Sequence, residues 1–318
     1  MVVQVKKTYR VFYFLVIGAV FYFGVMVKTV KADACVDMFG GILNQADHTY
    51  VLTGDLNGST CIIYANNITI DADGFSINTI VSGNGTNGIG GGNGTNGFNF
   101  TIENALLIGS SLQSIGGSSS SGSGGNGGNI TVRNSNIIEK VQSIGSSSYS
   151  GIPGSGGNIL IENSTFHNTL VTNGGGTYGS ENGGNGGSVT IRNSVSDLTD
   201  PIDGDSVAAY GGYSYSENGG NGGNVIVENS NLQGRINAYG GYGYYFFGNG
   251  GNVTITNSNI NTIRNTGVVI GSLTITDDAP TVTLTGDENM TIAFEDVYAE
   301  SGATAEDVKY TTTDLTGD

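Results

Sequence analysis

Residues Gly124–Asn136 read GGNGGNITVRNSN, and shortened forms of this stretch return along the chain. Each form has glycines, then a short run of alternating apolar and polar residues, and then asparagine. Copies begin at Gly97, Gly127, Gly156, Gly186, Gly222 and Gly250, with divergent copies at Ala65 and Gly271. They recur about every 30 residues, an interval typical of solenoids, propellers and arrays. Each copy is therefore predicted to be one unit of a repeat protein.

The apolar residues within a copy alternate with polar ones, as Ile130 and Val132 do, which predicts a strand with one buried face. Helical repeats are excluded, because no segment has a 3.6-residue period and each internal glycine would cost a helix about 1 kcal/mol. A propeller blade needs four strands and a longer unit. Further apolar positions follow, represented by Ile137 and then by Ile144 and Val171, so each unit is predicted to supply about three short strands.

Two aligned columns predict how the units are arranged. One column is all asparagine: Asn104, Asn134, Asn163, Asn193, Asn229 and Asn257. The column before it alternates in charge until its last member: Glu103, Arg133, Glu162, Arg192, Glu228 and Thr256. Parallel strands stacked about 4.8 Å apart would let each amide bond to its neighbours and place opposite charges above one another. We therefore expect direct stacking in sequence order with a structural asparagine ladder, and not a disordered chain.

The stacked units resemble a known fold. Residues 35–277 are similar to the right-handed, single-stranded parallel β-helix of the pectate-lyase superfold. Thr60–Ile77, TCIIYANNITIDADGFSI, looks like the first segment of secreted β-helix repeat proteins. The resemblance implies an all-β solenoid of about eight coils. Glycine without a strict three-residue period argues against collagen, and the glycine runs are expected to be loops that close each coil.

Composition restricts the possible functions. Only 37% of the chain is hydrophobic and 55 residues are glycine, which excludes an ordinary globular core. The net charge is −16 with only 11 basic residues, so a surface that neutralises phosphates cannot be assembled and nucleic acid is not an expected partner. A monomer without a cofactor is expected, unless calcium is bound.

The N-terminal segment, residues 1–34, has the features of an export signal. Lys6, Lys7 and Arg10 precede an apolar run, residues 11–27, and Ala32-Asp33-Ala34 follows as a cleavage site. An uncleaved transmembrane anchor helix is the alternative, because the run is long for a signal peptide. Both interpretations place the rest of the chain outside the cytoplasm, either secreted or at the cell surface.

The two cysteines, Cys35 and Cys61, are predicted to form a disulfide in that oxidising environment. Lipidation of Cys35 as the first mature residue is the alternative, although Ala32 and Asp33 make a poor lipidation motif.

The C-terminal segment, residues 278–318, has little glycine and many carboxylates. Residues 283–286 and 298–305 resemble the start of the bacterial Ig-like surface domain named after a pesticidal crystal protein. About 40 residues are too few for a complete sandwich, so a partial domain is expected.

Two groups of residues are candidate binding sites. Aromatic residues accumulate in the glycine-rich loops toward the C-terminal coils, and rings beside Asn and Ser suit a glycan-binding surface. The alternative is that these rings only cover the loops. The candidate glycan-binding residues are Tyr213, Tyr215, Tyr239, Tyr242, Tyr244 and Tyr245. The candidate calcium ligands are Asp197, Asp200, Asp203 and Asp205, for which a hydrated loop is the alternative.

The motifs of related pectin-degrading enzymes are missing. Neither His48 nor His167 lies in a Gly-His-Gly motif, and no clear group of catalytic carboxylates is present. The sequence is therefore interpreted as that of a non-catalytic, exported cell-surface protein for structural display or adhesion, with glycans as the expected ligand. The alternative is a polysaccharide lyase or glycoside hydrolase of the same superfold.

Overall fold

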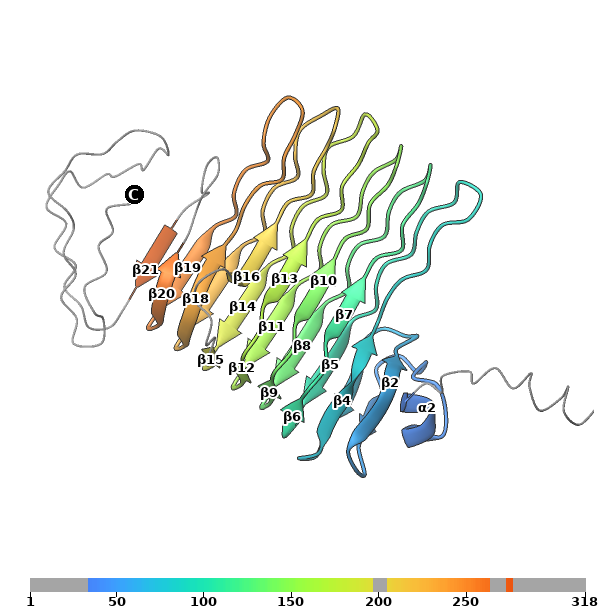
Figure 1. The fold of residues 1–318 in the computed structure, drawn as a ribbon, viewed down its shortest axis with the longest axis vertical. Coiled ribbons are helices and arrows are strands. Elements are labelled where there is room, and N and C mark those ends of the chain that lie inside the picture. The colour runs from blue at the N-terminus through green and yellow to red at the C-terminus, as the bar shows by residue number, and fades with distance from the viewer. Residues whose placement is uncertain (1–33, 197–204, 264–272, 277–318) are drawn as a thin grey trace, which may run out of the picture.

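The computed structural model describes residues 34–196, 205–263 and 273–276, which form a solenoid of two parallel sheets (Figure 1). The first sheet has nine strands: β1 (Thr49–Val51), β3 (Ile68–Asp71), β5 (Phe100–Glu103), β8 (Ile130–Arg133), β11 (Ile159–Glu162), β14 (Val189–Arg192), β17 (Val225–Glu228), β19 (Val253–Thr256) and β21 (Leu273–Thr276).

The second sheet lies across the core from the first. Its twelve strands are β2 (Leu56–Ile62), β4 (Ser76–Ser82), β6 (Leu107–Ile108), β7 (Leu112–Ile115), β9 (Asn136–Ile137), β10 (Val141–Ile144), β12 (Thr165–Phe166), β13 (Leu170–Asn173), β15 (Val195–Ser196), β16 (Asp205–Tyr210), β18 (Asn231–Asn237) and β20 (Asn259–Ile263). Most central coils therefore contribute one strand to the first sheet and two to the second, which is the three-strand unit that the apolar spacing predicts.

Successive coils lie directly on one another. Ile130 of β8 pairs in parallel with Phe100 of the preceding coil and with Ile159 of the following coil. The predicted parallel stacking in sequence order is thus confirmed. The first sheet has one strand more than the eight aligned copies, because β1 precedes the copy at Ala65.

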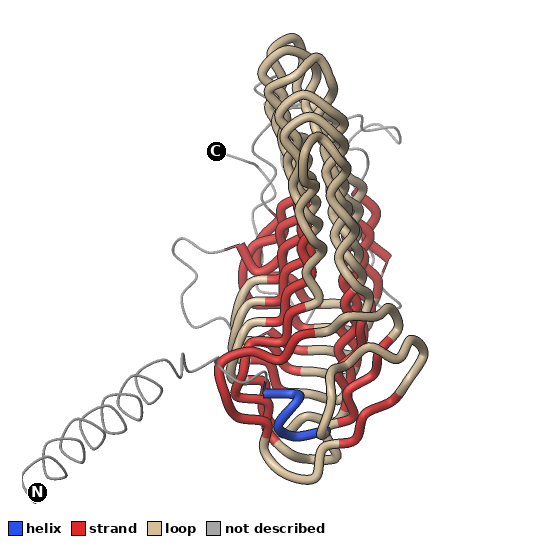
Figure 2. The backbone as a smooth tube through the Cα atoms, turned by 90° about the vertical axis from the view of Figure 1, so that its right-hand side faces the viewer, coloured by secondary structure: helices blue, strands red, loops and turns tan. Residues whose placement is uncertain are grey.

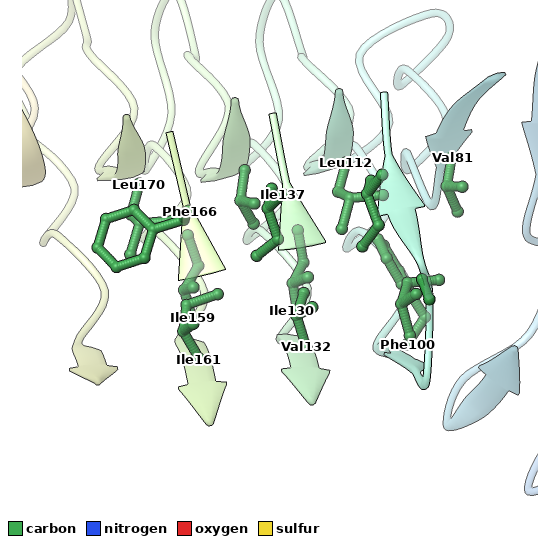
Figure 3. Close-up of a cluster of buried hydrophobic side chains, with 14 of the residues drawn as sticks. Val81, Phe100, Leu112, Ile130, Val132, Ile137, Ile159, Ile161, Phe166 and Leu170 are labelled. Atoms are coloured by element: carbon green, nitrogen blue, oxygen red, sulfur yellow. The ribbon is translucent and has the colours of Figure 1, made fainter. Parts of the chain in front are cut away.

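The core is a narrow column of aliphatic side chains between the two sheets (Figure 3). Ile130 and Val132 are fully buried, because alternate residues of a strand point to the same side. The predicted third apolar position is confirmed at Ile236, which is buried, but is wrong at Ile144 and Val171. Val171 is half-buried on the outer side of β13, and Leu170 fills the interior position.

The glycine-rich segments form a thin, two-layered projection, which we call the fin (Figure 2). Each segment leaves the second sheet along one arm, turns at the tip and returns along a second arm to the first sheet. The fin consists of residues 83–99, 116–129, 145–158, 174–188, 211–224 and 238–252. The fin is therefore a structural layer built by all the central coils together, and not a set of independent closing loops.

Backbone hydrogen bonds in the fin point in three directions in turn. Gly219 donates to a carbonyl of the following coil at 2.9 Å, and Gly220 donates to Gly212 O on the opposite arm at 2.8 Å. Asn221 N donates to Asn185 Oδ1 of the preceding coil at 2.9 Å. A direction that repeats every three residues is the symmetry of a polyproline-II-type chain. The Asn-Gly-Gly triplets of the glycine-rich segments have this three-residue period, although the rest of the chain does not.

Close approach of the arms explains why these positions are glycine. A Cβ built on Gly211 would lie 1.8 Å from Gly220 O on the opposite arm, and one on Gly184 would lie 2.1 Å from Gly154 O of the preceding coil. Both distances are far inside van der Waals contact, so the arms pack backbone against backbone. The high glycine content thus reflects packing, as it does at the axis of a collagen triple helix.

A disulfide-linked cap closes the N-terminal end of the core. The short helix α2 (Ala34–Phe39) packs against β2, with Ala34 and Cys35 buried. Cys35 and Cys61 form a disulfide, with their Cα atoms 4.8 Å apart. The cap covers the first coil, which has no preceding coil to cover its apolar side chains.

Two predicted segments lie outside the described residues. They are the signal peptide or anchor helix, except for its last residue Ala34, and the partial Ig-like domain. The short stretches 197–204 and 264–272 also lie outside the described residues. Within the described ranges, no helix combines the length and apolarity that crossing a bilayer requires.

A glycine-to-alanine pair tests the packing of the fin. The change Gly184→Ala is expected to lower the free energy of unfolding by about 1–3 kcal/mol, because its Cβ overlaps backbone of the neighbouring coil. The matched change Gly54→Ala, where no atom lies within 4 Å, should alter stability by less than about 0.5 kcal/mol. Urea unfolding of both variants checks this; equal effects would show that neighbouring coils are not in backbone contact in the fin.

The disulfide gives a second stability prediction. The sequence separation of its cysteines is 26 residues, so the change Cys61→Ser should destabilise the folded chain by about 3 kcal/mol. Thermal unfolding of this variant, and of the native chain with and without reductant, measures the effect. A reductant-insensitive midpoint for the native protein would contradict the expectation.

Candidate functional site: the fin tip and the ladders that place it

The asparagine ladder joins side-chain amides of neighbouring coils. Asn134 Nδ2 donates to Asn104 Oδ1 at 3.0 Å, and Asn193 Nδ2 donates to Asn163 Oδ1 at 3.2 Å. All six predicted members have a positive φ between 47° and 58°: Asn104, Asn134, Asn163, Asn193, Asn229 and Asn257. Asparagine tolerates this left-handed conformation better than most residues. The same residue therefore turns the chain and links neighbouring coils.

A buried serine ladder lies beside it, which the sequence analysis missed. Ser135 Oγ donates to Arg133 O at 2.6 Å and accepts the Ala105 N–H of the preceding coil at 3.0 Å. The same pattern recurs at Ser164, Ser194, Ser230 and Ser258. The signal was visible in the sequence, because serine follows every ladder asparagine except Asn104, which Ala105 follows. Each hydroxyl satisfies backbone groups that the asparagine turn would otherwise leave unpaired in a buried position.

The charge column pairs across coils as its alternation indicates. Arg133 Nε lies 3.0 Å from Glu162 Oε2, and Arg192 Nε lies 2.7 Å from Glu228 Oε2. These side chains are partly exposed, so each pair contributes less than about 1 kcal/mol. Their main effect is on register, because a slip by one coil would bring like charges together.

Stacking of the fin brings tyrosines from different coils to one place. Parallel bridges connect Ser119, Ser148, Thr177, Ser214 and Gly243 in order. The residues that follow four of them are tyrosines: Tyr149, Tyr178, Tyr215 and Tyr244. The first three have rings that stack, and we call these three the tyrosine column. These phenols lie far apart in sequence but on neighbouring arms of the fin.

Rings of the tyrosine column stack on one another. The ring centroids of Tyr149 and Tyr178 are 5.6 Å apart with an interplanar angle of 25°, and those of Tyr178 and Tyr215 are 4.6 Å apart at 9°. The Tyr213 ring meets both Tyr178 and Tyr215 edge-on. A hydrogen bond with Tyr213 is the main reason that the pKa of Tyr178 is raised. The faces of Tyr178 are thus occupied by other rings.

The last described tip, Tyr242–Phe247, has a different geometry, and we call it the terminal tip. Tyr242 meets Phe247 at 5.0 Å and 62°, and Tyr244 meets Tyr245 at 5.1 Å and 85°. Tyr242, Tyr244 and Phe246 are 72–74% exposed, the most of any aromatic side chain described. Edge-to-face pairs cover less ring surface than a parallel stack, so this tip exposes ring faces to solvent.

One predicted glycan-binding residue lies away from the tips. Tyr239 stacks on Tyr210 with centroids 5.5 Å apart, at the base of the fin, and both rings are half-buried. The structure therefore brings Tyr213 and Tyr215 together in one ring cluster and Tyr242, Tyr244 and Tyr245 together in the terminal tip. Tyr239 belongs to the support of the fin.

The candidate calcium ligands are mostly outside the described residues. Asp197, Asp200 and Asp203 lie in the stretch 197–204, and Asp205 begins β16. In the part of the chain that the structure describes, no three His, Cys, Asp or Glu side chains gather in an arrangement that could hold a metal ion.

Comparison with known proteins finds no matching family model, no matching curated protein and no matching solved structure. Interpretation of function therefore depends on the geometry described above. The features that it offers are the ladders, which are structural, and the exposed aromatic residues of the fin tip.

Substitutions at Asn163 test the ladder. The change Asn163→Ala removes the amide and places a less tolerant residue at φ 50°, so it should cost about 1–2 kcal/mol of stability. The change Asn163→Gly also removes the amide but suits the backbone, and it should cost less. Urea unfolding compares the two; glycine more damaging than alanine would contradict a role for the left-handed turn.

Proposed function

We propose that this chain is a non-catalytic, exported cell-surface protein that displays an aromatic binding tip, with glycans as its ligand. The observation that carries the proposal is the terminal tip, where five aromatic rings are exposed on a rigid, hydrogen-bonded support. Monomeric proteins rarely leave large apolar side chains grouped in this way unless the group contacts a ligand.

The terminal tip is the proposed contact site, and the tyrosine column is not. A sugar stacks its apolar face on a free aromatic face. Tyr178 offers neither face, because Tyr149 and Tyr215 lie against it. Tyr242 and Tyr244 are 74% and 72% exposed. They are also contacted edge-on, so more of their surface is available.

The charge balance favours uncharged sugars over acidic ones. The chain carries a net charge of −16, which repels anionic polymers. Tyr244 N donates to Glu217 O at 2.8 Å, so a carboxylate-bearing residue lies in the arm next to the terminal tip. Asparagine and serine side chains along the fin supply adaptable hydrogen-bonding groups of the kind that sugar hydroxyls need.

Export is supported by the disulfide, since such bonds persist in oxidising compartments. We infer that residues 1–34 direct the export as a signal peptide or anchor helix, and that residues 278–318 begin an Ig-like domain. We also infer a right-handed coil of the pectate-lyase type, because parallel crossovers are almost always right-handed.

Binding of the full chain to a panel of immobilised glycans tests the proposal. The double change Tyr242→Ala with Tyr244→Ala should weaken binding about ten-fold or more, as loss of aromatic contact residues commonly does. The matched change Tyr149→Ala removes an exposed ring of the stacked column and should leave binding unchanged.

Two outcomes would contradict the proposal. Undiminished binding by the double variant, with its thermal unfolding unchanged, would show that the terminal tip is not the contact site. Release of soluble sugar from the panel would instead indicate the alternative, a polysaccharide lyase or glycoside hydrolase.

A further inference from the structure

The tyrosine column places oxidisable side chains of three coils in contact at the edge of the fin. Tyr178 lies between Tyr149 and Tyr215, with centroid distances of 5.6 Å and 4.6 Å. All three rings are exposed, at 67%, 51% and 60% for Tyr149, Tyr178 and Tyr215. The glycan contact proposed at the terminal tip does not use these rings.

Two properties of the column suit a covalent reaction between phenols. Coupling requires that two phenol rings come into contact within the short lifetime of a radical. Stacked rings are already in contact when the radical forms. It also requires that an oxidant reach the rings and that the rings can tilt from a parallel stack into an edge-to-edge contact. Side chains that are more than half exposed satisfy both conditions.

We propose that the tyrosine column is a site of oxidative cross-linking, in which Tyr178 couples with Tyr149 or Tyr215 to form dityrosine. Each of the two phenols gives up one electron and one proton. The resulting radicals join through a carbon–carbon bond between ring positions ortho to the hydroxyls, and the two displaced ring protons return to the oxygens. Hydrogen peroxide, acting through a peroxidase-type one-electron oxidant, accepts the two electrons and two protons and leaves as two molecules of water.

The bond would join coils that only non-covalent contacts hold together at this position. Thr177 N donates to Tyr213 O at 3.0 Å, and Tyr215 N donates to Thr177 O at 3.2 Å. A covalent link between Tyr178 and Tyr215 would prevent these neighbouring coils from separating at the edge of the fin. An exported protein would meet the required oxidant outside the cytoplasm.

The remaining tyrosines provide internal comparisons. Tyr210 and Tyr239 are also stacked, at 5.5 Å and 16°, but they are half-buried at the base of the fin. Tyr64 is 47% exposed in the first coils, away from the column. The Tyr210–Tyr239 pair is therefore a control for stacking with less exposure. Tyr64 is a control for exposure without a stacked ring.

Treatment of the dilute full chain with hydrogen peroxide and a peroxidase tests the proposal. Dityrosine fluorescence should appear in the monomer band and should not depend on protein concentration. Peptide mapping by mass spectrometry should find Tyr178 joined to Tyr149 or Tyr215. The change Tyr178→Phe keeps the stacked ring but removes the phenol, so these cross-links should be lost without a change in thermal unfolding.

The control Tyr64→Phe should leave the cross-links intact. Three results would overturn the proposal: cross-links that join separate chains only, cross-links that map mainly to Tyr210 and Tyr239, or an undiminished yield in the Tyr178→Phe variant. None of these results depends on whether the terminal tip binds a glycan, so the two proposals fail separately.

Discussion

Direct parallel stacking of one coil on the next is the constraint on which the rest of this structure depends. Each backbone group of a strand pairs with the coil before or after it, so a coil has no independent fold. Asn134 bonds to Asn104, Ser135 accepts a hydrogen bond from Ala105, and Arg133 pairs with Glu162. All of these contacts need the same register. The fin inherits that register, and the aromatic residues at its tip come together only because the strands beneath them are aligned.

Much of the stacked β-sheet part of the chain could be predicted from the sequence, because equivalent residues of successive coils are of the same or of complementary type. The apolar alternation, the asparagine column and the alternating charges each depend on contacts between residues at fixed separation, and such contacts leave a mark in an alignment. The phase of the third strand was wrong at Val171, since an apolar residue on each side of a strand gives no alternation. The serine ladder was missed, because serine is common in this chain and hydroxyl donors tolerate many surroundings.

The fin and the candidate site could not be predicted to the same degree. Glycine runs indicate loops in most proteins, and only the close approach of two arms, seen at Gly211, shows that they are packed. Similarly, the sequence shows that tyrosines are frequent in these segments, but it does not show whether their ring faces are exposed. Tyr178 and Tyr244 look equivalent in the alignment, yet one is enclosed by neighbouring rings and the other projects from the last described tip.

The backbone packing of the fin has a consequence for how its stability should depend on temperature. Its two arms are in backbone contact, so its cohesion comes from hydrogen bonds with little apolar burial between the layers. Apolar burial is the contribution that weakens on cooling and gives unfolding its large heat capacity change. The β-helix body, with its aliphatic column, must lose part of its driving force in the cold. The hydrogen bonds of the fin do not weaken in this way on cooling. At low temperature the fin should therefore stay folded at least as well as the core that supports it.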